Sequence, residues 1–251
     1  MSFGPELFTA IARSFEESVL PCRIGKIETG DTWAAFRLSS GKDRWLLFSW
    51  NPGSYGCGLV GEDGIASLKK TRGSRSSFGE ALKRNLQNAS ILSVRQLNSD
   101  RVLVFAAERL VGAGFSVRLS LVFEGTERNS NLVILDETGS ILEPAKHIHG
   151  DMNRYRMILP GIAYTPPPPL KGKSLEETGE LEGPEDLREL RGIGKGLSGI
   201  LSRSWDSRPV PVWNNMLARL LCGGERQLLL QRHDSLLTVF PEPLPSCEVL
   251  S

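Results

Sequence analysis

Short runs rich in β-branched, aromatic and leucine side chains constrain the fold of this 251-residue chain more than any other feature. Between residues 22 and 50, Gly-Asp and Gly-Lys-Asp turns separate three such runs: CRIGKIETG, TWAAFRLSS and DRWLLFSW. Between residues 91 and 148, turns such as NSD and DETG separate five more: ILSVRQL, RVLVFAAE, FSVRLSLVFEG, NLVILDE and SILEPAKHI. Runs of this length between turn residues are typical of antiparallel strands. The pattern therefore predicts a first domain that is mostly antiparallel β.

Two amphipathic helices are expected beside these strands. Residues Pro5 to Val19 carry apolar side chains at four-residue spacing, and Pro21 ends the pattern. Residues Phe78 to Leu86 place three apolar side chains on one face and Lys83 and Arg84 towards solvent. Residues Asn51 to Ser77 are rich in Gly, Ser and Lys without a clean period, which indicates a long loop or a mobile element.

The proline run that begins at Pro166 marks a change in organisation. The run is followed by KGKSLEETGELEG, and a stiff segment followed by a flexible acidic one suits a linker, which we place at residues 166–184. The next segment, PEDLRELRGIGKGLSGILSR, predicts two short helices joined by a Gly-Ile-Gly break, a helix-hairpin-helix pattern. Residues Val212 to Cys222 predict another helix, and RQLLLQR with SLLTVFP predicts a short hairpin. The expected fold class is α+β: an antiparallel β-sandwich-like domain flanked by helices at residues 1–165, then a small helix-hairpin-helix domain at residues 185–251.

Composition excludes several classes of protein. Hydrophobic residues make up 40% and charged residues 24% of the chain, which is ordinary globular usage rather than that of a disordered chain. No run of about 18 apolar residues occurs, and Glu6 and Arg13 interrupt the N-terminal apolar pattern where a signal peptide would be uninterrupted. The four cysteines show no C-x-x-C spacing and so indicate neither a disulfide framework nor a zinc site. We therefore expect a cytoplasmic protein that neither is secreted nor spans a membrane.

The sequence gives no positive sign of catalysis. His147 and His149 alternate on one predicted strand, but no third ligand is nearby, so a polar strand face is favoured over a metal site. Neither a G-x-S-x-G elbow nor a G-x-x-x-x-G-K-[ST] phosphate loop is present. We therefore expect a protein that is not an enzyme and that needs no metal and no cofactor.

Three local features could contact nucleic acid. The first is a basic stretch with only Glu80 as its acid, and it contains Lys69, Lys70, Arg72, Arg75, Lys83 and Arg84. Such a stretch can neutralise phosphates or simply form a solvated face. The second is the turn of Gly192 and Gly194 followed by Lys195, which can present helix amides to a phosphate or only pack two helices. The third is Asp100-Arg101, which can project a guanidinium towards a phosphate or form a surface turn capped by the aspartate.

Several motifs, taken in order, resemble the NFACT family, the bacterial RqcH and eukaryotic NEMF group. They are Ser2-Phe3 before the first helix, Leu82-Lys83-Arg84-Asn85-Leu86, Asp100-Arg101, Arg128-Asn129-Ser130-Asn131, and the Arg-x-x-x-Pro-Gly-x-x-Tyr-x-Pro-Pro run from Arg156 to Pro167. The chain departs from the family pattern at Glu127, where a glycine is usual, and at Gly4-Pro5. Family members also continue into a long coiled coil and a second NFACT domain, so we expect this chain to be a fragment or a shortened relative.

The resemblance implies a fold and a function. It implies a first domain similar to the N-terminal domain of formamidopyrimidine-DNA glycosylases, followed by a helix-hairpin-helix domain. It also implies binding of tRNA, alanyl-tRNA in bacterial members, and of 50S ribosomal subunits that hold a stalled peptidyl-tRNA, in support of alanine tailing. In the family, the Asp-Arg pair belongs to the tRNA-contacting surface. The candidate RNA-binding residues are therefore Asp100 and Arg101 first, then Lys83, Arg84, Arg128, Lys69, Lys70, Arg72, Gly192, Gly194 and Lys195.

Two other functions compete with this interpretation. A DNA glycosylase would need a secondary amine at its mature terminus, but Pro5 is internal and removal of Met1 would expose Ser2. A fibronectin-binding adhesin is suggested by the label that many relatives carry, but the sequence shows no secretion signal or surface anchor. Ribosome-directed RNA binding is the function we expect.

Overall fold

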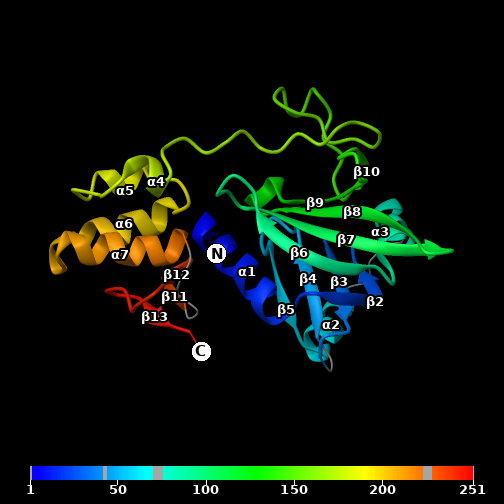
Figure 1. Cartoon of the computed structure of the whole chain (residues 1–251), viewed down its shortest axis with the longest axis horizontal. Helices are drawn as coiled ribbons and strands as arrows, with labels where there is room; N and C mark the ends of the chain where they lie inside the picture. Colours follow the sequence, from blue (N-terminus) through cyan, green and yellow to red (C-terminus); the bar gives the residue numbers. More distant parts are fainter. Residues whose placement is uncertain (1, 42–43, 70–75, 223–227, 251) are drawn as a thin grey trace. The chain divides into compact units, whose positions relative to one another are not determined.

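The computed structural model describes residues 2–250 except 42–43, 70–75 and 223–227 (Figure 1). Contacts within the chain divide it into two compact units. Unit 1 comprises Met1–Arg13, Gln96–Arg101 and Pro169–Ser251, and unit 2 comprises Ser14–Arg95 and Val102–Pro168. This division differs from the one expected from sequence, since two segments of the predicted first domain belong with the C-terminal part of the chain.

Hydrogen bonds explain why these segments join unit 1. β1 (Ser2–Phe3) pairs in parallel with β12 (Leu236–Phe240). The side-chain amide of Gln96 donates to the carbonyl oxygens of Pro5 at 2.9 Å and Asp100 at 2.8 Å. The predicted linker is also partly folded into unit 1: α4 (Leu175–Thr178) begins with a capping box, and Leu181 is fully buried. Local sequence patterns do not reveal such long-range partners.

Unit 2 is built on a large sheet, as the β-rich runs predict. Its strand order is β10-β9-β8-β7-β6-β2-β3-β4-β5, and every pairing whose register is described is antiparallel. The strands are β2 (Cys22–Thr29), β3 (Trp33–Leu38), β4 (Trp45–Ser49), β5 (Gly56–Val60), β6 (Ser90–Gln96), β7 (Val102–Gly112), β8 (Phe115–Glu124), β9 (Asn131–Leu135) and β10 (Ile141–Pro144). The predicted α+β class with a large antiparallel sheet is confirmed.

The sheet folds over on itself, because rings on distant strands meet. Phe48 of β4 contacts Phe105 of β7 and Phe123 of β8, with ring centroids 5.2 Å and 5.7 Å apart. Between β4 and β7 the sheet order places β3, β2 and β6. An irregularity in register between Ile24 and Ile27 lies where β2 passes from its pairing with β6 to its pairing with β3, and bulges of this kind bend strands.

Two helices accompany the sheet. α3 (Ser77–Leu86) begins at Ser76, whose hydroxyl accepts the Gly79 amide at 3.0 Å, and it buries the apolar face that its spacing predicts. The segment expected to be a long loop instead contains β5 and α2 (Glu62–Lys69). Glu62 accepts the indole N–H of Trp45 at 2.7 Å, and Ile65 is fully buried in the cluster around that ring. These contacts order a segment that has no periodic pattern of its own.

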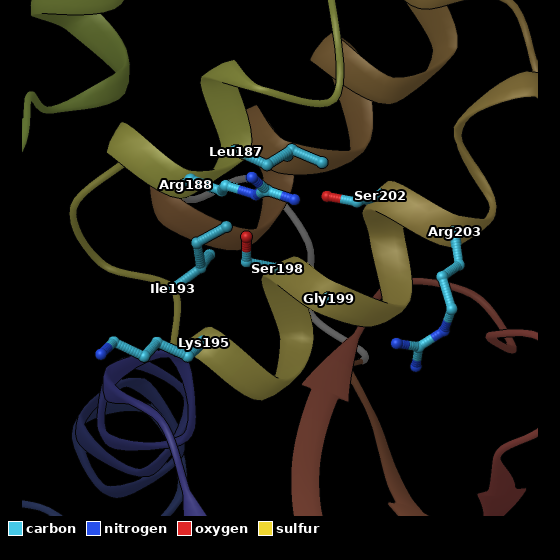
Figure 2. A pocket seen from close by; sticks show the side chains of 8 residues that line it. All are labelled: Leu187, Arg188, Ile193, Lys195, Ser198, Gly199, Ser202 and Arg203. Carbon is cyan, nitrogen blue, oxygen red and sulfur yellow. The ribbon is translucent and has the colours of Figure 1, made fainter.

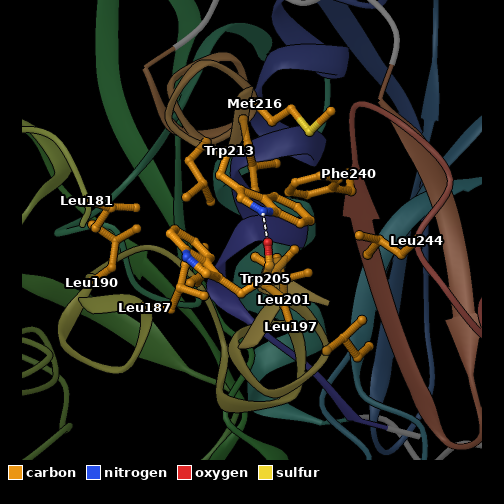
Figure 3. Close-up of a cluster of buried hydrophobic side chains, with 14 of the residues drawn as sticks. Leu181, Leu187, Leu190, Leu197, Leu201, Trp205, Trp213, Met216, Phe240 and Leu244 are labelled. Atoms are coloured by element: carbon orange, nitrogen blue, oxygen red, sulfur yellow. Dashed lines mark hydrogen bonds between the residues drawn. The ribbon is translucent and has the colours of Figure 1, made fainter. Parts of the chain in front are cut away.

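The core of unit 1 is centred on two stacked tryptophans (Figure 3). The rings of Trp205 and Trp213 lie 5.8 Å apart at an interplanar angle of 10°, and the Trp213 indole donates to the Trp205 carbonyl at 2.8 Å. Apolar side chains from α5 (Asp186–Glu189), α6 (Lys195–Arg203) and α7 (Val210–Leu221) pack around them. A sheet of order β1-β12-β11-β13 completes the unit, with β11 (Leu229–His233) and β13 (Glu248–Val249). The expected hairpin is β11–β12, whereas the naming of α5, turn and α6 as a helix-hairpin-helix motif stays a prediction.

Helices in the described part of the chain are all too short or too polar to cross a bilayer. Within the same residues, His, Cys, Asp and Glu side chains nowhere gather in threes that could hold a metal ion.

Candidate functional site

The Asp100-Arg101 pair lies on a tightly hydrogen-bonded turn of unit 1. Asp100 is only 6% exposed, and its Oδ1 accepts the Arg101 amide at 2.7 Å. The backbone amide of Asp100 donates to the Leu97 carbonyl at 3.0 Å. The side-chain amide of Gln96 donates to the backbone carbonyl of Asp100 at 2.8 Å. The aspartate therefore caps the turn, as the alternative interpretation of the sequence expects.

Arg101 is the side chain of this turn that remains available for a ligand. It is half-buried, and among the described residues it forms no ion pair with Asp100 or with any other acid. The backbone that carries it is fixed by the Asp100 cap, so the guanidinium stem starts from a defined position. Because the backbone of Arg101 is already ordered, less conformational entropy is lost when its guanidinium binds a phosphate. The RNA-binding role of Arg101 stays a prediction.

The glycine turn of unit 1 lies beside the Asp100 turn. Gly192 has a φ of +93°, and a Cβ added there would lie 3.0 Å from Leu221 and 3.8 Å from the Cβ of Ser99. A cavity of about 350 Å³ opens between the two turns, and its lining includes Ser99, Gly192 and Arg191. The Nε of Arg191 is buried without a hydrogen bond to a described residue, although its Nη2 bonds to Glu177. The fold thus brings together two predicted RNA-binding elements that are about 90 residues apart in sequence.

The second glycine of this turn is already bonded to a carboxyl group of the chain itself. The Gly194 amide donates to Glu6 Oε2 at 2.7 Å, and the hydroxyl of Thr238 donates to Glu6 Oε1 at 2.9 Å. Burial raises the pKa of Glu6 above its ordinary value, although these hydrogen bonds lower it in part. A Cβ at Gly194 would lie 2.7 Å from the Cα of Gly4. Gly194 is thus closely packed, while Lys195 is exposed beside it; an RNA-binding role for either residue stays a prediction.

The remaining predicted RNA-binding residues belong to unit 2 or lie outside the described residues. Lys69 is exposed, lies 3.2 Å from Glu28, and sits over the Trp45 ring at 5.6 Å. Lys83 lies 3.7 Å from Glu80, and Arg84 and Arg128 are exposed. Lys70 and Arg72 lie outside the described residues. Because Lys83 and Arg84 are in unit 2, their proximity to Asp100 and Arg101 stays a prediction.

Sequence reasoning missed a buried ion pair in unit 2. The guanidinium of Arg156 donates to both carboxylate oxygens of Glu124 at 2.6 Å, and the Tyr164 hydroxyl donates to the same carboxylate at 2.7 Å. Burial alone would lower the pKa of Arg156, but the hydrogen bonds and charge of Glu124 raise it; burial and Glu124 also raise the pKa of Tyr164. The Arg-x-x-x-Pro-Gly-x-x-Tyr motif drew attention to Arg156 and Tyr164. No neighbouring residue pattern identified Glu124 as the partner of both.

Asn131, the last residue of the Arg128-Asn129-Ser130-Asn131 motif, has a structural role. Its side chain is fully buried, donates to the Lys146 carbonyl at 2.9 Å and accepts the Lys146 amide at 2.9 Å. The amide group therefore acts like one more residue of a strand pair. This asparagine and the Arg156 network hold unit 2 together rather than face a ligand.

The fold is shared with solved structures of bacterial proteins. The N-terminal part of the fibronectin/fibrinogen-binding protein from Streptococcus suis superposes with a TM-score of 0.75 at 21% identity, covering 98% of this chain and 92% of that one. The N-terminal domain of the fibronectin-binding protein PavA from Streptococcus pneumoniae gives a TM-score of 0.69 at 22% identity, covering 100% and 94%. At these identities the likeness shows the fold alone.

Curated relatives match part of their own length. The chain is 35% identical over 94 residues to the Rqc2 homolog RqcH of Streptococcus suis, covering 37% of this chain and 17% of that protein. It is 27% identical over 196 residues to the Rqc2 homolog RqcH of Bacillus subtilis, covering 76% of this chain and 32% of that protein. The chain thus spans a third or less of the length of these relatives.

The family assignment rests on a match to a family model. Residues 7–198 match the family described as NFACT N-terminal and middle domains, and this range is more than half of the chain. The resemblance that the sequence motifs indicate is thereby confirmed. The chain belongs to the NFACT family, in the part that forms its N-terminal and middle domains.

Proposed function

We propose that this chain is the tRNA- and large-subunit-binding module of a ribosome-associated quality-control factor. The observation that carries the proposal is the family match over residues 7–198, supported by relatives named Rqc2 homolog RqcH. In this proposal, the complete factor acts on 50S subunits that hold a stalled peptidyl-tRNA, and it recruits alanyl-tRNA for alanine tailing. The chain contributes by binding in the cytoplasm and not as an enzyme.

Arg101 is the residue we propose to contact the tRNA backbone first. Its backbone amide is held by the Asp100 cap, its side chain has no acidic partner among the described residues, and Gly192 lies beside its turn. Arginine suits phosphate because its planar guanidinium can donate two hydrogen bonds at once. Lys195 in unit 1 and Lys83, Arg84 and Arg128 in unit 2 would add weaker, non-directional attraction.

The test measures tRNA binding over a range of salt concentrations. We expect Arg101→Ala to weaken the affinity about tenfold and to reduce the slope of log affinity against log salt by about one. Arg232→Ala is the matched control, since Arg232 is an exposed arginine of unit 1 that is already paired with Glu248. Unchanged affinity in the double variant Asp100→Ala, Arg101→Ala would overturn the site assignment.

The second test concerns the ribosome. The chain should sediment with 50S subunits that retain peptidyl-tRNA and less with subunits stripped of it. Equal sedimentation with both kinds of subunit would contradict recognition of the stalled state. Although two solved neighbours are described as fibronectin-binding proteins, that likeness is one of fold, so we do not propose adhesion for this chain.

A further inference from the structure

A second cavity of unit 1 lies along one face of α6 (Figure 2). It has a volume of about 450 Å³, which is within the range of about 300–1,000 Å³ typical of small-molecule sites. Its lining consists of Leu187, Arg188, Ile193, Lys195, Ser198, Gly199, Ser202 and Arg203. Three of these side chains are cationic and none is acidic, so the chemistry of the lining favours an anion.

The three cations are not neutralised by the acids around them. Arg188, Lys195 and Arg203 are exposed, and none forms an ion pair with a described residue. α5 itself carries two acids, Asp186 and Glu189. The Asp186 carboxylate accepts the amides of residues 182 and 183, and Glu189 is not part of the lining. The positive charge is therefore open to a ligand.

Ser198 supplies a hydroxyl donor to the cavity. The residue is only 6% exposed, yet its hydroxyl forms no hydrogen bond with a described residue, and Figure 2 shows it directed into the cavity. The hydroxyl lines the cavity, so it can donate to a ligand that enters there. The neighbouring Ser202 is different, since its hydroxyl already donates to the Pro184 carbonyl at 3.2 Å. Ser198 is therefore a donor that is available to an anion in the cavity.

The rest of the lining suits a ligand that is not a bare ion. Leu187 and Ile193 are buried residues of the unit-1 core and give the cavity an apolar side. Gly199 has no side chain, and a Cβ added there would lie 3.6 Å from the Arg203 guanidinium. An anionic group beside the cations and an apolar, planar group beside Leu187 and Ile193 match the chemistry of a phosphorylated nucleoside.

We propose that this cavity binds a nucleoside phosphate, with Ser198 and Arg188 donating to the phosphate oxygens. Lys195 and Arg203 add positive charge at the rim. The nucleotide can be free or can be one residue of an RNA strand. The proposal does not depend on tRNA binding through Arg101, because it concerns another cavity of unit 1 and shares only Lys195 with the proposed tRNA contacts.

The test titrates AMP, adenosine and inorganic phosphate into the whole chain by calorimetry. We expect AMP to bind saturably and more tightly than adenosine or phosphate. The double variant Arg188→Ala, Arg203→Ala should raise the Kd for AMP at least about tenfold, and Ser198→Ala should raise it several-fold. The matched control is Lys171→Ala, Arg232→Ala, which removes two exposed cations of unit 1 outside the lining. Absence of saturable AMP binding, or equal Kd values in the pocket and control variants, would overturn the proposal.

A second arm identifies the source of the phosphate. If the Arg188→Ala, Arg203→Ala variant loses both AMP and tRNA affinity, the cavity takes a nucleotide of an RNA strand. If it loses AMP affinity alone, the ligand is a free nucleotide. Arg101→Ala should keep the AMP affinity of the unsubstituted chain, so failure of this site and failure of the proposed function give different results.

Discussion

Breaking the buried ion pair of unit 2 should remove a large part of that unit's stability. The side chains of Arg156 and Glu124 are 6% and 0% exposed and are joined by two hydrogen bonds of 2.6 Å. In Arg156→Ala the Glu124 carboxylate would stay buried without its counter-charge. Removing one partner of such a pair costs about 3–5 kcal/mol, whereas whole proteins are typically stable by about 5–15 kcal/mol.

Two further variants separate the contributions within this network. Tyr164→Phe removes a neutral donor to a charged acceptor, so we expect a loss of about 1.5–3 kcal/mol. The double variant Glu124→Leu, Arg156→Met removes both charges and leaves none buried alone. It should therefore unfold with a smaller loss than Arg156→Ala, although it contains more substitutions.

The assay is urea unfolding, with hydrogen exchange of β8 peptides to report on unit 2 specifically. Arg154→Ala is the control, because Arg154 is exposed and lies two residues away on the same loop. If Arg156→Ala lowers the free energy of unfolding by no more than about 0.5 kcal/mol beyond this control, the buried pair does not stabilise the fold as argued.

Three further predictions concern buried polar contacts and close packing. Because the folded pKa of Glu6 is raised above 4.5, its contribution to stability is complete below that pH and is lost as pH rises through the folded value. The unfolding free energy of Glu6→Gln relative to the unsubstituted chain should therefore increase from acidic to neutral pH, and a flat difference would contradict the raised pKa. Gly194→Ala should lower the unfolding free energy by about 1–3 kcal/mol, measured in urea, because the new Cβ would press on Gly4. Asn131→Ala should cost about 1–3 kcal/mol in the same assay through its lost bonds to Lys146, and Asn129→Ala, an exposed neighbour, should cost little.

Local patterns predicted the elements of the fold well where one face is buried. The first helix was expected at Pro5–Val19 and forms at Pro5–Ser18; the second was expected at Phe78–Leu86 and forms at Ser77–Leu86. The pattern missed β5 and α2, since their order comes from Trp45 and other side chains that precede them. Hydrophobic periodicity in a sequence reflects the burial of one face of a helix or strand. An element that is ordered mainly by side chains of other segments therefore shows only a weak periodic pattern.

The candidate site was predictable as a set of motifs but not as an arrangement. Motif spacing drew attention to Asp100 and Arg101, yet only the structure shows that the aspartate caps the turn. The partner of the Gly194 amide is Glu6, which is 188 residues away in sequence. No local rule links two such residues, and none links Ser198 to Arg188 and Leu187 on the facing helix of the cavity.

The parallel pairing of β1 with β12 sets the order in which a growing chain can complete its parts. Residues 2 and 3 pair with residues 236 and 237, whereas unit 2 is complete at residue 168. Synthesis at about 5–20 residues per second would separate these two events by roughly 3–14 s. During that interval unit 2 can fold, while the first strand of the chain has no neighbour to pair with. A chaperone that shields the emerging N-terminal segment would therefore act on unit 1 and not on unit 2.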